Sequence, residues 1–211
     1  MLAESEPPSR GKRSRAGNAM DRARSGVIAG ALRSIARDGV RRTSMADVAD
    51  LGGVARATLY NHFRTKDDVL LAVVEAEAQR LADVALALPP RGLEAALAAV
   101  CDELAGHQAL RKVVAEEPAL ALEIARVGQT PTWNHVRQQV AGVLAATEHA
   151  VDKGTVDVVL RWLVVEALSP SAPELRRQSL IVLVDGLPRA AAIFVVGEPV
   201  GQAFDDAAYG R

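Results

Sequence analysis

The sequence of 211 residues has one cysteine, few aromatic residues and no long apolar run. Cys101 cannot form a disulfide within the chain, which fits a reducing cytoplasm. The longest apolar stretches, such as residues 190–196, are far too short to span a membrane. The N-terminus carries arginine and proline in place of an apolar segment, which does not fit a secretory signal. These features predict a cytoplasmic protein with no membrane segment.

Several signatures of enzymes are also missing. The four histidines, at positions 62, 107, 135 and 149, lack the spacing of metal ligands. There is no Gly-rich phosphate loop, nucleophile elbow or HExxH motif. Cys101 lies on an amphipathic segment and suits packing better than nucleophilic catalysis. We therefore expect no catalytic residues, no metal and no other cofactor.

Charge is distributed unevenly along the chain. Residues 10–66 contain 13 Lys or Arg and 4 Asp or Glu, a balance of +9, whereas residues 67–211 contain 12 and 20, a balance of −8. The net charge of −1 hides this division. A basic quarter joined to an acidic remainder indicates a module that binds a polyanion. The alternative is chance clustering of surface charge.

Apolar periodicity and capping residues predict an all-α fold. Two further observations agree with this: aromatic residues are only 3% of the chain, and no strand-like alternation or internal repeat is present. Residues 1–20 lack periodicity, which indicates a disordered basic arm. A helix at 21–37 would end at Gly39, two short helices would follow, and a third would run from Thr65 to the prolines at 89–90. Later helices are predicted at 93–106, 109–127 with a break near Pro118, 132–149, 155–168 and 173–187.

The two short helices, separated by Gly52 and Gly53, form a helix-turn-helix layout over about residues 44–63. The run VADLGGVARATLYNHF at 48–63, followed by Arg64, Thr65 and Lys66, resembles the signature of the TetR family of transcriptional regulators. That signature is I-A-x-x-A-G-V-S-x-x-T-[LI]-Y-x-[HY]-F-x-[ST]-K. The match has no gaps and covers residues 21 to about 81. It departs at Ala55, where the family has a Ser or Thr cap whose loss costs about 1 kcal/mol.

The resemblance implies that the second short helix enters the major groove and that Thr58, Tyr60 and His62 lie near phosphates or base edges. Arg56 and Asn61 are of the types that pair with guanine and adenine, so we expect them to read bases. The predicted DNA contacts are Thr43, Ser44 and Lys66 at phosphates, and Arg56, Ala57, Thr58, Tyr60, Asn61 and His62 on the helix.

Less specific interpretations of the same residues stay open. In these interpretations, Tyr60 and Phe63 are core aromatic residues, and His62 is an ordinary surface residue. The basic residues of the arm, Arg10, Lys12, Arg13 and Arg15, would be a solubilising tail and not a DNA contact.

The resemblance implies that residues 82–211 form a helical domain for effector binding and homodimerisation. The helices at 155–168 and 173–187 are more apolar than packing within one chain needs, and the alternative is that both are central to one subunit. Predicted interface residues are Val159, Leu163, Leu180, Leu183, Val184 and Leu187. Polar or aromatic residues within apolar helices are the pocket candidates, with an ordinary structural role as the alternative for each: His107, Arg111, Trp133, Trp162 and Glu166.

These features together predict a sequence-specific DNA-binding regulator. We expect a repressor that leaves a double-stranded palindromic operator when a small-molecule effector binds, although the family also contains activators. The alternatives are a helical interaction or scaffold module, or a small-molecule-binding protein, that has lost DNA regulation. Binding of DNA from the upstream region of its own gene separates these classes.

Overall fold

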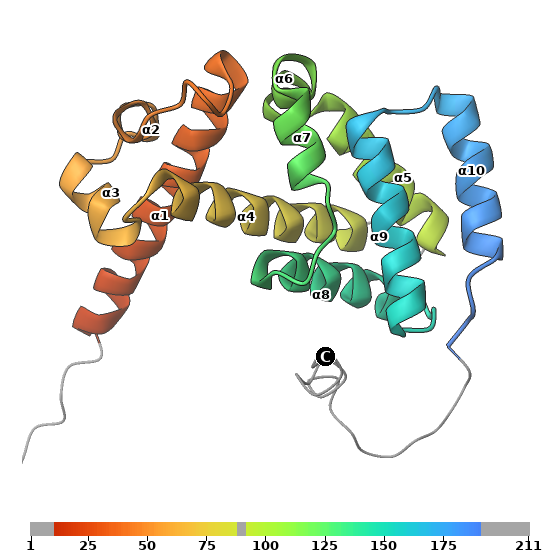
Figure 1. Cartoon of the computed structure of the whole chain (residues 1–211). Helices are drawn as coiled ribbons and strands as arrows, with labels where there is room; N and C mark the ends of the chain where they lie inside the picture. The colour runs from red at the N-terminus through yellow and green to blue at the C-terminus, as the bar shows by residue number, and fades with distance from the viewer. Residues whose placement is uncertain (1–10, 88–91, 191–211) are drawn as a thin grey trace, which may run out of the picture.

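A computed structural model describes residues 11–87 and 92–190, and these residues form an all-α structure (Figure 1). They contain no strand apart from an isolated bridge between His149 and Arg189. The predicted fold class is therefore confirmed. The helices are α1 (Gly11–Asp38), α2 (Met45–Gly52), α3 (Arg56–His62), α4 (Lys66–Ala87), α5 (Gly92–Gly106), α6 (Gln108–Glu116), α7 (Pro118–Ile124), α8 (Pro131–Ala146), α9 (Lys153–Leu168) and α10 (Pro173–Asp185).

Helix α1 begins at Gly11 and not near Asp21, so the part of the expected disordered arm from residue 11 to residue 20 is helical. This segment contains no proline and carries Lys, Arg and Ala, which favour helix. Because extending a helix fixes one residue for each hydrogen bond gained, the packed part of α1 can propagate outward. The rest of the arm, residues 1–10, lies outside the described residues.

Helices α1, α2 and α3 and the first turns of α4 surround one apolar core. Its buried members include Val27, Val48, Leu59 and Phe63, so the apolar positions of the motif hold the short helices against α1. The crossing of α1 and α2 is unusually close. A Cβ at Gly30 would lie 2.3 Å from the carbonyl oxygen of Val48, so only glycine allows the two backbones to approach this far.

Local signals define the ends of the short helices. Ser44 and Asp47 form a capping box at the start of α2, and the hydrogen bond from the Ser44 side chain holds the pKa of Asp47 below its usual value. Gly53 ends α2 with φ +64, in the left-handed region that favours glycine. Thr65 caps α4 by accepting a hydrogen bond from the Asp68 N–H at 3.1 Å. Gly53 and Thr65 lie where the sequence predicts the turn between the short helices and the start of the long helix.

Helix α4 runs from the helix-turn-helix region into the C-terminal body (Figure 1). There it packs against α5 and α8, while α9 packs on α5 and α8 and α10 packs on α5. Leu93, Leu97, Leu144, Val159 and Leu160 are among the buried residues of the core between these helices. Helix α6 packs against α1, so the body touches the N-terminal helices at a second place.

Candidate nucleic-acid interface and effector cavity

Helix α3 places a polar face in solvent. Arg56, Ala57, Tyr60 and Asn61 are exposed, and 54% of Tyr60 is accessible. Tyr60 is therefore not a core aromatic, whereas Phe63 is, with 6% exposed. The remaining predicted contacts on the helix, Thr58 and His62, are half-buried.

The first turn of α3 has no side-chain cap, because Ala55 stands at the N-cap. Arg56 Nη2 lies 3.9 Å from Asp50 Oδ2, and both side chains are exposed. An exposed ion pair of this length contributes little to stability, so Arg56 can exchange it for another partner at small cost.

The predicted phosphate contacts next to the motif divide into two groups. Thr43 is 3% exposed, and its hydroxyl donates to the Gly39 carbonyl at 2.8 Å and accepts from Ser34 at 3.1 Å. The prediction that Thr43 contacts a phosphate is therefore wrong, because the hydroxyl is buried and satisfied inside the domain. Lys66 Nζ donates to the Val40 carbonyl at 3.2 Å, so it also points inward in this structure. Ser44 is exposed and stays a candidate.

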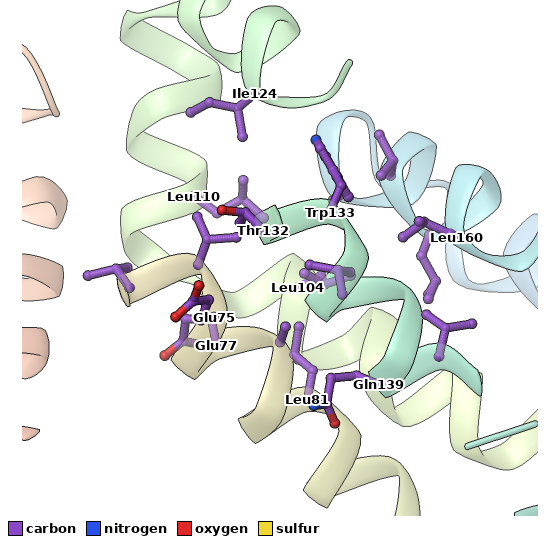
Figure 2. Close-up of a pocket in the computed structure, with 18 of the residues that line it drawn as sticks. Glu75, Glu77, Leu81, Leu104, Leu110, Ile124, Thr132, Trp133, Gln139 and Leu160 are labelled. Carbon is purple, nitrogen blue, oxygen red and sulfur yellow. The ribbon is translucent and has the colours of Figure 1, made fainter. Parts of the chain in front are cut away.

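The C-terminal body contains a cavity of about 870 Å³ whose walls come from α1 and from α4 to α9 (Figure 2). Most of the wall is apolar, and it includes the buried Leu93, Leu97, Leu144 and Leu160. Binding sites for small molecules have volumes of roughly 300–1,000 Å³ and similar apolar walls with a few polar groups. The cavity has the size and lining of such a site.

A histidine–carboxylate pair joins α4 to α6 at the wall of this cavity. His107 Nε2 lies 3.2 Å from Glu77 Oε2, and Arg80 Nε donates to the same oxygen at 2.8 Å. His107 Nδ1 accepts from the Leu110 N–H at 3.0 Å and so caps α6, which leaves Nε2 as the donor to Glu77. Burial alone would raise the pKa of Glu77, but the hydrogen bonds from His107 and Arg80 hold it below its usual value.

The other charged residues of the described cavity wall are mostly acidic. Glu75 and Glu123 join Glu77, and the basic member of the wall is Arg126. Outside the wall, Arg24 Nη2 lies 3.9 Å from the Glu75 carboxylate. Neutral polar groups come from α8 and the residue before it: Thr130, Thr132 and Gln139.

Of the predicted pocket residues, His107 and Trp133 line the cavity (Figure 2 labels Trp133). Arg111, Trp162 and Glu166 do not line this cavity, which corrects their placement in its wall. The Arg111 guanidinium donates to the carbonyl of Ala167. Glu166 accepts from the Ser171 N–H at 3.1 Å and from its hydroxyl at 2.6 Å. Trp162 packs against the core of the body.

Sequence reasoning missed the acidic residues of the cavity. Glu75 and Glu77 interrupt the apolar stretch of α4 between Val69 and Val84, and that interruption is the signal that could have found them. The interruption does not indicate which of the two glutamates faces the body, since residues two apart point in different directions on a helix.

The six residues predicted for a dimer interface divide into two groups. Val159, Leu180 and Val184 are at most 8% exposed and lie in the core of their own subunit, which corrects their assignment to an interface. Leu163, Leu183 and Leu187 pack against the same core but are half-buried, so their interface role stays a prediction. Other apolar side chains of α9 and α10 are exposed by 43–74%, and we call them the α9–α10 apolar face: Val158, Val165, Leu175, Ile181 and Val182.

Three other observations bear on alternative functions. None of the described helices is both long and apolar enough to cross a membrane. The same residues contain no group of three or more His, Cys, Asp and Glu that could hold a metal. Cys101 is 2% exposed, and burial raises its pKa to about 12, so the thiol stays protonated and serves as a packing residue.

The family model described as bacterial regulatory proteins, tetR family, matches residues 27–73, which extend from α1 into α4. The HTH-type transcriptional regulator TtgR from Pseudomonas putida is 38% identical over 52 residues. That match covers 25% of this chain and 25% of TtgR, so it spans about a quarter of the curated relative.

Two solved structures extend the similarity over most of the chain. The TetR family repressor AlkX from a Dietzia species has a TM-score of 0.60 at 18% identity, over 77% of this chain and 93% of AlkX, which shows a shared fold. The multidrug binding protein EbrR in complex with ethidium has a TM-score of 0.53 at 26% identity, over 77% of this chain and 98% of EbrR. The motif and the family model agree that residues 27–73 are similar to bacterial regulatory proteins of the tetR family, and the all-helical fold is similar to those of AlkX and EbrR.

Proposed function

We propose that the protein is a dimeric, sequence-specific DNA-binding repressor whose operator affinity is lowered by a small molecule in the cavity. The exposed polar face of α3 carries the proposal, because the other side of that helix is buried and only this face can meet a partner. Arg56 and Asn61 supply the donors and acceptors that match base edges in the major groove. Ala57 and Tyr60 complete the exposed face.

The α9–α10 apolar face supports a dimer. Val158 and Val165 are seven residues apart on α9, as are Leu175 and Val182 on α10, so each helix carries an apolar stripe in solvent. A second subunit would bury both stripes in a four-helix interface. Two subunits would place their α3 helices at two half-sites about 34 Å apart, or at a related spacing.

Sequencing of genomic fragments that the purified protein retains tests this proposal. We expect a shared motif with two-fold symmetry near promoters, and DNA retention that weakens as salt is raised. If the protein retains no fragment above background, the result instead supports the alternative that it is an interaction or scaffold module. Transcription from a recovered promoter, measured with and without the protein, decides between repression and activation.

The first prediction concerns base recognition by α3. Arg56→Ala and Asn61→Ala should each relax the preference at one base pair of the half-site, at a cost of about 1–3 kcal/mol there. Arg64→Ala is the matched control, since Arg64 is exposed in the same domain but follows α3. It should affect all sequences equally, through loss of a phosphate contact. Selection with each variant measures the preference, and an altered motif for Arg64→Ala alone would reverse these roles.

The second prediction concerns the chemistry of the effector. Three carboxylates and one arginine line the described cavity wall, while Arg24 and Arg80, which pair with Glu75 and Glu77, lie outside it. The wall itself therefore favours an apolar molecule with a positive charge. EbrR, which was solved with ethidium, is consistent with this proposal. Tetraphenylphosphonium and tetraphenylborate have nearly the same shape and opposite charge, so they isolate the effect of charge. We expect the phosphonium ion to bind about tenfold more tightly, equal to about 1.4 kcal/mol.

Quenching of Trp133 fluorescence reports this binding directly. Trp162→Phe removes the other tryptophan, which packs in the core away from the cavity. Equal affinity for the two ions, or a preference for the borate, would contradict a cationic effector while leaving the DNA-binding proposal intact.

A further inference from the structure

The turn between α1 and α2, residues 39–43, is held by a buried carboxylate from the C-terminal body. Glu117 is 7% exposed, and its Oε1 accepts a hydrogen bond from the Arg41 N–H at 3.1 Å. Gly39 has φ +82, and a Cβ at this position would lie 2.3 Å from the same oxygen. The carboxylate therefore occupies the space that the absent side chain of Gly39 leaves.

Glu117 lies at the junction of two helices that line the cavity. Its N–H donates to the Val113 carbonyl on α6 at 2.8 Å, and its own carbonyl accepts from the Ala121 N–H on α7 at 3.0 Å. Leu110 on α6 and Ile124 on α7 both face the cavity (Figure 2). A ligand that displaces either helix therefore displaces the Glu117 carboxylate.

The turn itself also reaches the cavity. Val40 is buried, lines the cavity wall and packs in one apolar cluster with Ile35, Ala109 and Val113. On its other side, the Val40 carbonyl accepts the hydrogen bond from Lys66 at the start of α4. The turn is thus fixed between the cavity wall and α4, and α2 begins directly after it.

The two oxygens of the Glu117 carboxylate have different surroundings. Oε2 is buried and has no hydrogen-bond partner among the described residues. Burying a carboxylate oxygen without a partner is unfavourable, so the arrangement is held by the Arg41 hydrogen bond and by packing against Gly39. The neighbouring Glu116 also contacts the turn, through Arg42 at 3.3 Å, but both side chains are exposed, so this is an ordinary surface pair that contributes little.

We infer that Glu117 is the positioning residue that couples the cavity to the DNA-reading helices, an inference that rests on the proposed function. When a ligand moves the α6–α7 junction, the Arg41 N–H loses its acceptor. The turn is then free to shift, and α2 and α3 leave the orientation that the operator requires. Glu117 acts through this turn and does not touch DNA.

Operator affinity and hydrogen exchange of the Arg41 amide test the inference on the full-length dimer. The operator is a recovered genomic fragment, and the probe is whichever tetraphenyl ion binds more tightly. In the wild type we expect the probe to weaken operator binding by about tenfold and to speed exchange at Arg41. Glu117→Ala should show both changes without the probe, and the probe should then have no further effect. Glu117→Gln keeps an acceptor oxygen and should restore the response, and Glu116→Gln is the matched control.

The outcomes separate this inference from the proposed function. A wild-type protein that retains no DNA contradicts the proposed function itself. A Glu117→Ala variant that binds the operator normally, or that responds to the probe like the wild type, overturns the coupling role alone. If that variant does not fold, exchange at Arg41 in the wild type decides, because a probe that binds without changing it overturns the inference. If neither ion binds, the Glu117→Ala variant is compared with the wild type without a probe. The inference is overturned if both its Arg41 exchange and its operator affinity equal those of the wild type.

Discussion

A Val182→Asp variant is expected to be a folded monomer that has lost specific operator binding. Val182 is 74% exposed in the subunit, so aspartate there is solvated and the subunit keeps its fold. In a dimer the same carboxylate would be buried without a partner. Leaving a buried charge without a partner costs about 3–5 kcal/mol of dimerisation free energy, which raises the dimer dissociation constant by two orders of magnitude or more. Loss of the second half-site contact should then reduce operator affinity by about 10²–10⁴.

Val184→Asp is the matched control for this prediction. The two valines are two residues apart on α10, but Val184 is 8% exposed and packs in the core of the subunit. Its replacement should unfold the body, so loss of helical circular dichroism distinguishes it from Val182→Asp. Sedimentation of both proteins and of the wild type measures the oligomeric state. A wild-type monomer at micromolar concentration, or a Val182→Asp protein that is still dimeric, would show that α10 does not form the interface.

A Gly30→Ala variant is expected to lose both stability in the N-terminal domain and DNA binding. The added Cβ would lie 2.3 Å from the Val48 carbonyl oxygen and 2.6 Å from the Gly52 nitrogen, both backbone atoms of α2. Neither atom can move unless the whole of α2 moves. Overpacking of this kind typically costs about 1–3 kcal/mol, and the better helix propensity of alanine offsets up to about 1 kcal/mol of that. The displaced α2 would carry α3 with it.

Gly142→Ala provides the comparison. Gly142 also lies within a helix, α8, but apart from its chain neighbours and the backbone of α8 itself, no described atom lies within 4 Å of its ideal Cβ. Alanine there should stabilise the protein by up to about 1 kcal/mol through helix propensity alone. Thermal unfolding and operator affinity of both variants measure the difference. Equal stability of the two variants would contradict the close contact between α1 and α2.

The sequence alone predicted the elements whose determinants are local. The capping box of Ser44 and Asp47, the turn at Gly53 and the cap at Thr65 each depend on residues within three positions, so α2, α3 and the start of α4 were predicted correctly. The absence of a cap at Ala55 was predicted for the same reason. The start of α1 was not, because no residue near Gly11 marks a boundary and helix extension depends on the packed segment that follows.

The direction in which each helix face points was decided by the tertiary structure. On α9 and α10 apolar residues occur on more than one side, so periodicity could not tell the core residue Val184 from the exposed Val182. Likewise, the i, i+4 relation between Trp162 and Glu166 says that they share a side, but packing turns that side away from the cavity.

The resemblance to the TetR family and the polar face of α3 were therefore determined by the sequence itself, since a gap-free motif specifies both the local backbone and the residues on that face. The tertiary structure decided the rest. It buried Thr43, assigned the core and the exposed face of α9 and α10, and brought Glu117 to the turn at Gly39 across 78 positions of the chain. The physical reason is that helix periodicity is a local property, whereas burial depends on neighbours that are distant in sequence.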